Sequence, residues 1–277
     1  NDGSKPATIL FAMHPIERLR YVARADGAGP ALLVRETALA LCAMEFDPQS
    51  LMLACRRVVE RQPTYAQLWW LCANVLASPE PFRRARELAM VVERDETPGH
   101  LDDALPDDAR VVIVGWPFTT VKCVAQRGDA TMLVVDSHGE GEAIVDRLHD
   151  AEIAAELVPF ECVAAAVQQA SVVVIEALAC GPDQALAVGG SLTVVETARA
   201  LGTPVWLVTG VGTRLPDALW RGMTSALALD DWRAGLDVVE VRRFERIIGP
   251  HGLTDDTSAS LEAECPASTE LLRRSAI

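Results

Sequence analysis

From Ala109 onward, short apolar runs alternate with helical stretches almost to the C-terminus. The apolar runs are rich in β-branched residues and lie at 111–115, 131–135, 156–158, 172–175, 205–209 and 238–241. Helical stretches separate them at 120–126, 141–150, 162–169 and 191–201. Strands buried on both faces are unbroken apolar runs, and intervening helices allow neighbouring strands to be parallel. The alternation therefore predicts a doubly wound, mostly parallel, Rossmann-like α/β sheet.

The part of the chain before this alternation shows apolar residues at helical spacing instead. Asp47-Pro48 is typical of a helix start, and Thr64–Gln67 has the capping-box pattern that precedes a helix. The segment 93–108 is polar, acidic and interrupted by proline, which indicates a linker or a surface loop. We expect a helical domain over 1–105, followed by the Rossmann-like domain over 106–277.

The chain of 277 residues is strongly acidic, with a formal net charge of -14. A nucleic-acid-binding protein needs a basic surface, so we expect no nucleic-acid partner. No apolar stretch is long enough to span a membrane, and the N-terminal residues lack the pattern of a signal peptide. The seven cysteines are scattered singly, without the spacing of metal ligands or of a disulfide framework. Composition therefore predicts a cytoplasmic protein with no metal site and no membrane partner.

The loops that follow the strands are the places to look for chemistry, because ligands bind beyond the carboxyl ends of parallel strands. The loop after the first strand contains Trp116, Thr119, Thr120 and Lys122. Two hydroxyls, the N–H groups of a helix start and a lysine are together suited to phosphate binding. Helix capping by Thr119 and packing of Trp116 explain the same residues, so both interpretations stay open.

The loops after the second and fourth strands contain titratable side chains. Asp136 and His138 are candidates for acid–base catalysis, although the same residue types occur in ordinary surface turns. The segment 176–190 is long for a connection between a strand and a helix, and such loops are often functional. It adds Glu176 and Cys180 as further catalytic candidates.

Two glycine-containing segments complete the set of loops. Gly189, Gly190 and Ser191 come just before a helix, where an open backbone allows an anion to approach, and plain capping is the alternative. Arg214, in the loop 209–214, is either a phosphate ligand or a solvated side chain. The sequence has no phosphate-loop, zinc-protease or nucleophile-elbow motif. We therefore expect neither a hydrolase nor a nucleotide triphosphatase, and no cofactor.

A series of loose motifs runs through most of the chain in a consistent order. Arg61–Leu68 is similar to an Arg-Pro-Thr segment at a helix start, and Asp136–His138 occupies the place of Glu-Thr-Arg. Val172–Leu178 parallels a strand that leads into Gly-Ala-Asp, and Cys265–Leu272 is similar to Asn-Pro-x-Phe-Asp-x-Thr-Pro. In this order, the chain resembles the family of the alpha, beta and delta subunits of translation initiation factor 2B. That family also contains methylthioribose-1-phosphate isomerase and ribose-1,5-bisphosphate isomerase.

The resemblance includes departures at the positions that carry catalysis and phosphate binding in the isomerases. Trp116 lies about where their catalytic Cys would be, and Ala177 or Leu178 takes the place of their Asp. None of these side chains can exchange a proton. Asp26 replaces an arginine, and the apolar pair Ala187–Val188 lies near the place of an Asn-Lys pair. The resemblance therefore implies the family's scaffold without its catalytic pair.

The resulting prediction is a catalytically silent, initiation-factor-2B-like binding or regulatory protein, whose ligand is a phosphorylated sugar or nucleotide. The candidate ligand-binding residues are Arg61, Trp116, Thr119, Thr120, Lys122, His138, Glu176, Gly189, Gly190 and Ser191. One alternative is a diverged aldose–ketose isomerase whose acid–base residues come from Asp136, His138, Glu176 and Cys180. Another alternative is a structural assembly partner. The resemblance also implies a homodimer.

Overall fold

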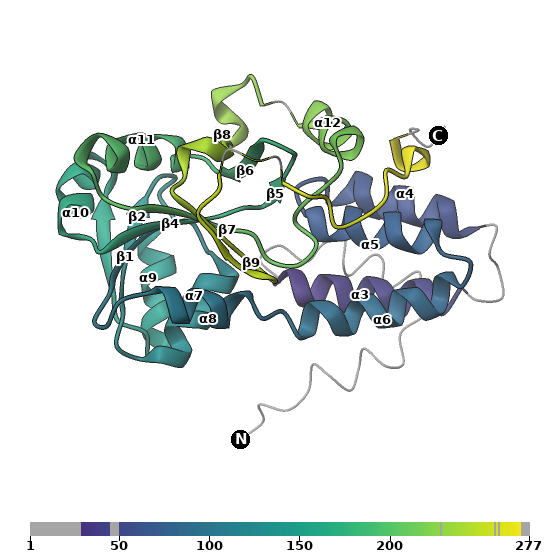
Figure 1. Cartoon of the computed structure of the whole chain (residues 1–277), viewed down its shortest axis with the longest axis horizontal. Coiled ribbons are helices and arrows are strands. Elements are labelled where there is room, and N and C mark those ends of the chain that lie inside the picture. The colour runs from purple at the N-terminus through teal and green to yellow at the C-terminus, as the bar shows by residue number, and fades with distance from the viewer. Residues whose placement is uncertain (1–28, 45–49, 228, 258, 260, 273–277) are drawn as a thin grey trace.

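The structure is a computed structural model that describes residues 29–44, 50–227, 229–257, 259 and 261–272. In this part of the chain, a group of helices lies beside a layered α/β region (Figure 1). The predicted fold class, a helical N-terminal region followed by a mostly parallel sheet, is confirmed. Among the helices described, none combines the length and apolar character that a membrane span requires.

The described helices of the N-terminal region are α3 (Pro30–Cys42), α4 (Leu51–Arg61), α5 (Ala66–Ala77), α6 (Pro81–Glu93) and α7 (Thr97–Ala104). Helix α5 is central, because it contacts α3, α4 and α6 and buries most of its side chains. Its sequence is apolar on nearly all sides and includes Trp69 and Trp70, as expected for a helix inside a core. Helices α3 and α6 lie side by side (Figure 1).

The prediction that 93–108 is a linker or a loop is wrong over much of its length, because α7 lies within it. Thr97, Pro98 and Leu101 are buried on one side of this helix, and Leu101 belongs to a core shared with the sheet. A proline in the first turn is compatible with a helix, since the N–H that it lacks would have no partner there. The helix was not predicted because its apolar face is short and most residues of the segment are polar or acidic.

One of the helix starts predicted from a capping pattern differs from the structure. Helix α5 begins at Ala66, with Tyr65 at its N-cap and no side-chain cap, so the capping box at Thr64 does not form. Burial of α5 therefore stabilises this helix more than its cap does. The other predicted start, Asp47-Pro48, lies outside the described residues.

The main sheet has seven strands in the order β10-β9-β7-β4-β1-β2-β3. All neighbouring pairs are parallel except β9 and β10. Their bounds are β1 (Arg110–Val114), β2 (Thr131–Asp136), β3 (Ala155–Pro159), β4 (Val172–Glu176), β7 (Val205–Val208), β9 (Arg246–Gly249) and β10 (Gly252–Thr254). Five of the six parallel strands, β1, β2, β3, β4 and β7, coincide with apolar runs in the sequence, to within about a residue or two at each end.

Helices cover both faces of this sheet, as predicted. The helices that follow α7 are α8 (Phe118–Arg127), α9 (Gly141–Asp150), α10 (Val163–Gln169), α11 (Ser191–Leu201) and α12 (Asp217–Ala226). Val111 and Ile113 pack in a core with α7, α8 and α9, whereas Val112 and Val114 pack in another core with α10 and α11. This alternation follows from the two-residue period of a strand, which turns successive side chains to opposite faces.

A smaller, antiparallel sheet was not predicted. It consists of β5 (Ala179–Cys180), β6 (Gln184–Val188) and β8 (Leu236–Glu240), in that order. The run at 238–241 was assigned to the parallel sheet, and 176–190 was assigned to a loop, so both assignments are wrong. Most of the β8 side chains are half-buried rather than fully buried, which fits an antiparallel strand with one covered face. Pairing of β6 with β8 spans a long sequence separation, which local patterns do not reveal.

The C-terminal segment 261–272 returns to the helical region. Its last part is a short 3-10 helix, η5 (Thr269–Leu272), which contacts α4 and α12. The Ser268 hydroxyl donates a hydrogen bond of 3.1 Å to the Ala73 carbonyl, and Leu271 is buried in the helical core. The helical core thus includes residues from both ends of the described chain. In the described part of the chain, further 3-10 helices are η2 (Phe160–Cys162), η3 (Trp232–Ala234) and η4 (Val241–Arg243).

Candidate functional site

The strand order identifies one crevice as the natural place for a ligand. From β1 the chain adds β2 and β3 on one side, and it then crosses over to add β4, β7 and β9 on the other side. The direction of winding therefore reverses between β1 and β4. In doubly wound sheets, ligands bind outside the carboxyl ends of the strands at such a switch point. Here that position is occupied by the end of β4 and the start of α8.

Glu176, at the end of β4, places its carboxylate on the first turn of α8. The backbone N–H of Thr119 lies 3.0 and 2.9 Å from the two carboxylate oxygens, and its hydroxyl donates to Oε1 at 3.0 Å. The N–H and the hydroxyl of Thr120 donate to Oε2 at 3.1 and 3.3 Å. These N–H groups have no partner within the helix, so Glu176 acts as a cap from a distant strand. The hydroxyl and N–H donors predicted to hold a phosphate therefore hold a carboxylate of the chain itself.

The environment of Glu176 shifts its pKa upward. Burial at the switch point is the larger effect, and the hydrogen bonds from Thr119 and Thr120 oppose it by stabilising the ionised form. A raised pKa is compatible with proton transfer. All the same, the N–H and hydroxyl groups of both threonines already engage the two oxygens, which limits the role of this carboxylate as a base.

Trp116 is held by its neighbours rather than exposed to a ligand space. The guanidinium carbon of Arg147 lies 3.8 Å from the centre of its ring, and the Phe118 ring packs edge-on with centroids 6.3 Å apart. Trp116 contacts the core beneath α8 and α9, where it is partly buried. Lys122 is exposed on the outer side of α8. Of the four residues predicted in this loop, only the threonines face the switch point.

The structure brings His138 and the glycines before α11 together. A Cβ atom added at Gly189 would lie 2.7 Å from Nε2 of His138, and a Cβ atom added at Gly190 would lie 2.7 Å from Cβ of Ser137. The two loops are therefore in close contact. The N–H of Gly189 is used by the Gly235 carbonyl at 2.8 Å. This packing explains both glycines without a ligand, although it leaves the exposed His138 ring at the rim.

Two more helix starts at this edge are capped by carboxylates from other elements. Asp136 Oδ1 accepts a hydrogen bond of 3.1 Å from the N–H of Gly141, the first residue of α9. Asp237 Oδ2 accepts one of 2.9 Å from the N–H of Leu192, in the first turn of α11 beside Ser191. Together with Glu176 on α8, the chain places one of its own anions at each of these three helices.

Two other sequence candidates lie outside this edge. Cys180 is buried in β5, and burial raises the pKa of its thiol well above the usual value. A buried, protonated thiol is a poor nucleophile and a poor acid–base group. Arg61 is exposed at the end of α4, a helix that contacts α3, α5 and η5. Within the described residues, no group of three His, Cys, Asp or Glu side chains could hold a metal ion.

The loop 209–214 after β7 is fixed by two acids that sequence reasoning missed. Asp95 Oδ2 accepts from the N–H of Val211 at 3.0 Å, while its Oδ1 accepts from the N–H and hydroxyl of Thr97. Glu264 Oε2 accepts from the N–H groups of Gly212 and Arg214 at 2.9 and 3.1 Å. Asp95 comes from the α6–α7 connection and Glu264 from the C-terminal segment. The glycines of this loop indicated backbone N–H groups that needed acceptors, but no pattern in the neighbouring sequence identified Asp95 and Glu264 as those acceptors.

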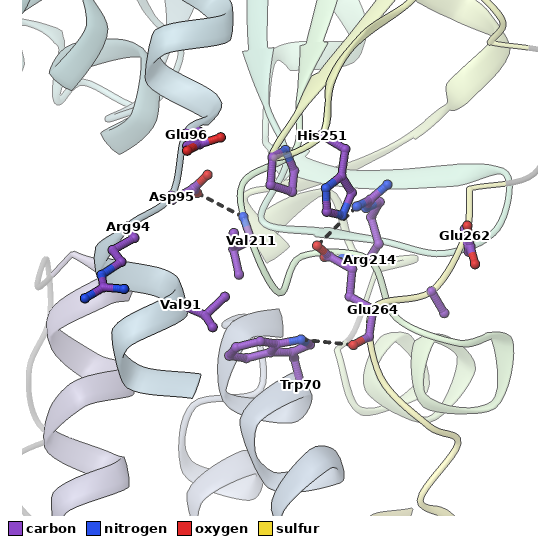
Figure 2. A pocket seen from close by; sticks show the side chains of 12 residues that line it. Trp70, Val91, Arg94, Asp95, Glu96, Val211, Arg214, His251, Glu262 and Glu264 are labelled. Carbon is purple, nitrogen blue, oxygen red and sulfur yellow. Dashed lines mark hydrogen bonds and ion pairs between the residues drawn. The ribbon is translucent and has the colours of Figure 1, made fainter. Parts of the chain in front are cut away.

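Arg214 is neither a solvated side chain nor a free phosphate ligand. Its Nη2 lies 3.2 Å from Oε1 of Glu264, and both side chains are largely buried. The indole N–H of Trp70 donates to the Glu264 carbonyl at 3.1 Å, which ties this ion pair to the helical core. These residues form one wall of a cavity of about 590 Å³, shown in Figure 2. We call it the junction cavity; it is lined by Trp70, Val91, Arg94, Asp95, Glu96, Val211, Arg214, Pro250, His251, Glu262, Ala263 and Glu264.

Comparison with known proteins gives matches in structure only. No protein-family model matches the sequence, and no curated protein sequence matches it either. Translation initiation factor eIF-2B of Pyrococcus horikoshii OT3 has a TM-score of 0.72 at 15% identity, over 87% of this chain and 97% of that chain. A chain of the tetrameric eIF2B-beta2-delta2 complex of Chaetomium thermophilum has a TM-score of 0.66 at 13% identity, over 90% of this chain and 95% of that chain. The 5-methylthioribose 1-phosphate isomerase of Pyrococcus horikoshii OT3 has a TM-score of 0.65 at 12% identity, over 88% of this chain and 85% of that chain.

These matches confirm the predicted resemblance at the level of the fold. They cover nearly the whole of each chain, so the shared architecture includes the helical region as well as the sheet. At such low identity, a common fold does not transfer an activity. Function must therefore be argued from the residues at the carboxyl edge of the sheet.

Proposed function

We propose that this chain is a catalytically silent binding or regulatory protein, built on the fold of the initiation factor 2B subunits and the related isomerase. The motif order puts Trp116 where the isomerases have their catalytic Cys, and Ala177 or Leu178 where they have their Asp. Ala177 is buried and apolar, and Trp116 is packed by Arg147 and Phe118. These side chains offer no acid or base.

The observation that carries the proposal is the position of the Glu176 carboxylate on the first turn of α8. A phosphate at the switch point would need the N–H and hydroxyl donors of Thr119 and Thr120, and these already bind Glu176. A second anion there would also be repelled by the first. We therefore propose that any phosphorylated ligand uses donors other than these. The remaining candidates at this edge are His138, Gly190 and Ser191, because the N–H of Gly189 already bonds to the Gly235 carbonyl.

The proposed silence is tested with the sugar phosphates of the related isomerases. Purified protein is incubated with methylthioribose 1-phosphate or ribose 1,5-bisphosphate, and the sugars are followed by NMR. We expect no aldose-to-ketose conversion. In parallel, Glu176→Ala should gain thermal stabilisation from inorganic phosphate that the wild type and the exposed control Glu161→Ala lack. Aldose-to-ketose conversion by the wild type, at a rate well above the rate in buffer without protein, would contradict the proposal.

One observation favours a diverged isomerase as the second candidate. The raised pKa of Glu176 gives the switch point a carboxyl group suited to proton transfer. If conversion is detected, Glu176→Gln should abolish it while leaving the fold intact by circular dichroism. An unchanged rate would reject Glu176 as the base and direct attention to His138 and Asp136.

We also propose that the protein is a homodimer in the cytoplasm. The match to a tetrameric eIF2B complex supports assembly of this fold into oligomers. The scattered cysteines support a location in a reducing compartment. Sedimentation velocity over a range of protein concentrations tests the dimer, and a monomer at all concentrations contradicts it.

A further inference from the structure

Three exposed apolar side chains gather at one corner of the main sheet, beyond the ends of β2 and β3. Leu157 and Phe160 follow each other along β3 and η2, and Leu192 lies in the first turn of α11; they are 37%, 40% and 40% exposed. A Cβ atom added at Gly141 would lie 2.6 Å from Leu157. One added at Gly190, two residues before Leu192, would lie 3.3 Å from the Phe160 ring. Exposed apolar side chains that gather in this way are typical of a contact surface when polar residues surround them.

The polar residues around this corner are acidic. The segments that form it, 136–142, 157–163 and 189–193, contain four carboxylates and neither lysine nor arginine, although His138 is also present. Asp136 caps α9, whereas the exposed carboxylates of Glu140, Glu142 and Glu161 have no hydrogen bond or ion pair with other described residues. We call this surface the acidic corner, and it consists of Glu140, Glu142, Leu157, Phe160, Glu161 and Leu192.

The arginines on adjoining elements have partners of their own. Arg147, in the second half of α9, lies over the Trp116 ring. Arg233, on η3, pairs with Asp231 at 3.5 Å. These two arginines therefore leave the charges of Glu140, Glu142 and Glu161 uncompensated.

A second surface with exposed apolar residues lies on α4, and its charge is opposite. Met52 and Leu53 are 39% and 38% exposed. Arg57 and Arg61 follow Leu53 at intervals of four residues, so these three lie in one row along the helix. Both arginines are exposed, and neither has a hydrogen bond or ion pair with other described residues. We call this surface the arginine face, and it consists of Met52, Leu53, Arg57 and Arg61.

The acids beside the arginine face do not cancel its charge. Glu60 is exposed on the same helix, and Glu270 is exposed on η5, whose backbone carbonyl at Glu270 accepts a 2.7 Å hydrogen bond from Arg56. Among the described residues, the surface of α4 and η5 thus has three arginines against two glutamates. It is locally positive in a chain whose net charge is -14.

The charges of the two surfaces disfavour symmetric pairing and favour unlike pairing. Two acidic corners repel each other, and so do two arginine faces. An acidic corner and an arginine face attract each other, and each offers apolar side chains that the other covers. At physiological salt, charges more than about 8 Å apart are largely screened, so the charges at a contact count for more than the net charge of the chain.

We propose that copies of this chain associate head to tail, with the arginine face of one copy on the acidic corner of the next. In Figure 1, α4 and α10, the helix that directly follows η2, lie at opposite ends of the longest axis. A contact between unlike surfaces repeats from copy to copy, so it forms a chain of copies, or a ring where the rotation closes. The inference does not rest on the proposed function, because a symmetric homodimer stops at two copies.

The first experiment measures assembly by sedimentation velocity of the full chain, over a range of concentrations at physiological salt. We expect the wild type to form species larger than two copies as its concentration rises. Arg57→Glu with Arg61→Glu, and separately Glu142→Arg with Glu161→Arg, place like charges on both sides of the contact. Each pair should weaken association at least about tenfold. A wild type that never exceeds two copies overturns the proposal, and so does either double variant if it assembles as the wild type does.

The second experiment mixes the two double variants in equal amounts. Every acidic surface then meets a basic one again, so we expect the mixture to recover the large species that each variant alone has lost. Arg94→Glu and Glu262→Arg are the controls, because they make the same charge changes at exposed residues outside both surfaces. A mixture that fails to recover, or controls that assemble as poorly as the double variants, would show that the contact lies elsewhere and would overturn the proposal.

The third experiment tests the apolar part of the contact. Phe160→Ser removes the aromatic ring from the acidic corner and should weaken association at least about tenfold. Leu253→Ser, on β10, is the matched control, because Leu253 and Phe160 are both 40% exposed. Equal association of these two variants contradicts the assignment of the contact to the acidic corner.

Discussion

The switch point and the junction cavity lie at the same edge of the sheet, and both are lined by carboxylates, yet they differ in what those carboxylates do. At the switch point, Glu176 engages the N–H and hydroxyl donors of Thr119 and Thr120. At the junction cavity, Asp95 and Glu264 are engaged in the same way, but the buried Nε of Arg214 has no hydrogen-bond partner among the described residues. The difference shows that glycines, hydroxyls and helix starts do not define a site until their hydrogen bonds are accounted for.

The largest expected effect concerns the buried ion pair of the junction cavity. Glu264→Ala removes the acceptor for the N–H groups of Gly212 and Arg214 and leaves the Arg214 charge without its partner. Breaking a buried pair in this way typically costs about 3–5 kcal/mol. We expect a loss of unfolding free energy of about that size in urea titrations. The exposed neighbour Glu262→Ala should change stability by less than about 0.5 kcal/mol; similar effects in both variants would mean that the pair does not fix the loop.

A smaller effect, which depends on pH, is expected at the switch point. The folded-state pKa of Glu176 is raised above the ordinary value of 4.5, so the protonated form is favoured by folding. The stability that the folded protein gains from protonated Glu176 is therefore fully present below pH 4.5, and it declines as the pH rises through the folded-state pKa. Urea titrations at a series of pH values should show the stability difference between the wild type and Glu176→Ala shrinking as the pH rises across this window. A difference that grows with pH would show that the hydrogen bonds outweigh burial.

The smallest expected effect concerns Trp116, at the rim of the switch point. Arg147→Ala removes the guanidinium above the indole ring, and such contacts at exposed sites contribute about 0.5–1 kcal/mol. Chemical denaturation should show a loss in that range, and Arg147→Lys should recover part of it. The neighbouring substitution Asp146→Ala, on the same helix, is the control. A change of about 2 kcal/mol or more for Arg147→Ala would mean that this residue has a further role in holding the loop.

The sequence predicts the central strands of the sheet well, because each of them is an unbroken apolar run that can be recognised without knowing its neighbours in space. Strands β1, β2, β4 and β7 are buried almost throughout, so their unbroken apolar runs mark them directly. Strands β5 and β6 were missed because 176–190 contains polar and small residues that are typical of a loop. Helix α7 was missed because only one side of an acidic segment is apolar.

The site was less predictable than the sheet, because its partners are distant in sequence. Thr119 and Glu176 were both candidates, but the contact between them spans 57 residues. It shows that the donors interpreted as a phosphate-binding site bind the carboxylate of Glu176, which caps the helix. The contact of Asp95 with Val211 spans 116 residues, and neither residue stood out from its neighbours. Arg214 was weighed as a ligand or a solvated side chain, and its pairing with Glu264 required the fold.

The return of the C-terminal segment has a consequence for how the chain is made. The helical core contains Leu271, and Ala73 in α5 accepts a hydrogen bond from Ser268, although α5 ends at Ala77. At roughly 5–20 residues per second, a ribosome needs about 10–40 seconds to proceed from Ala77 to Leu271. During that interval the helices emerge with a gap in their core that only later synthesis can fill. The helical region is thus made before the sheet, but its core is completed only after the sheet has been made.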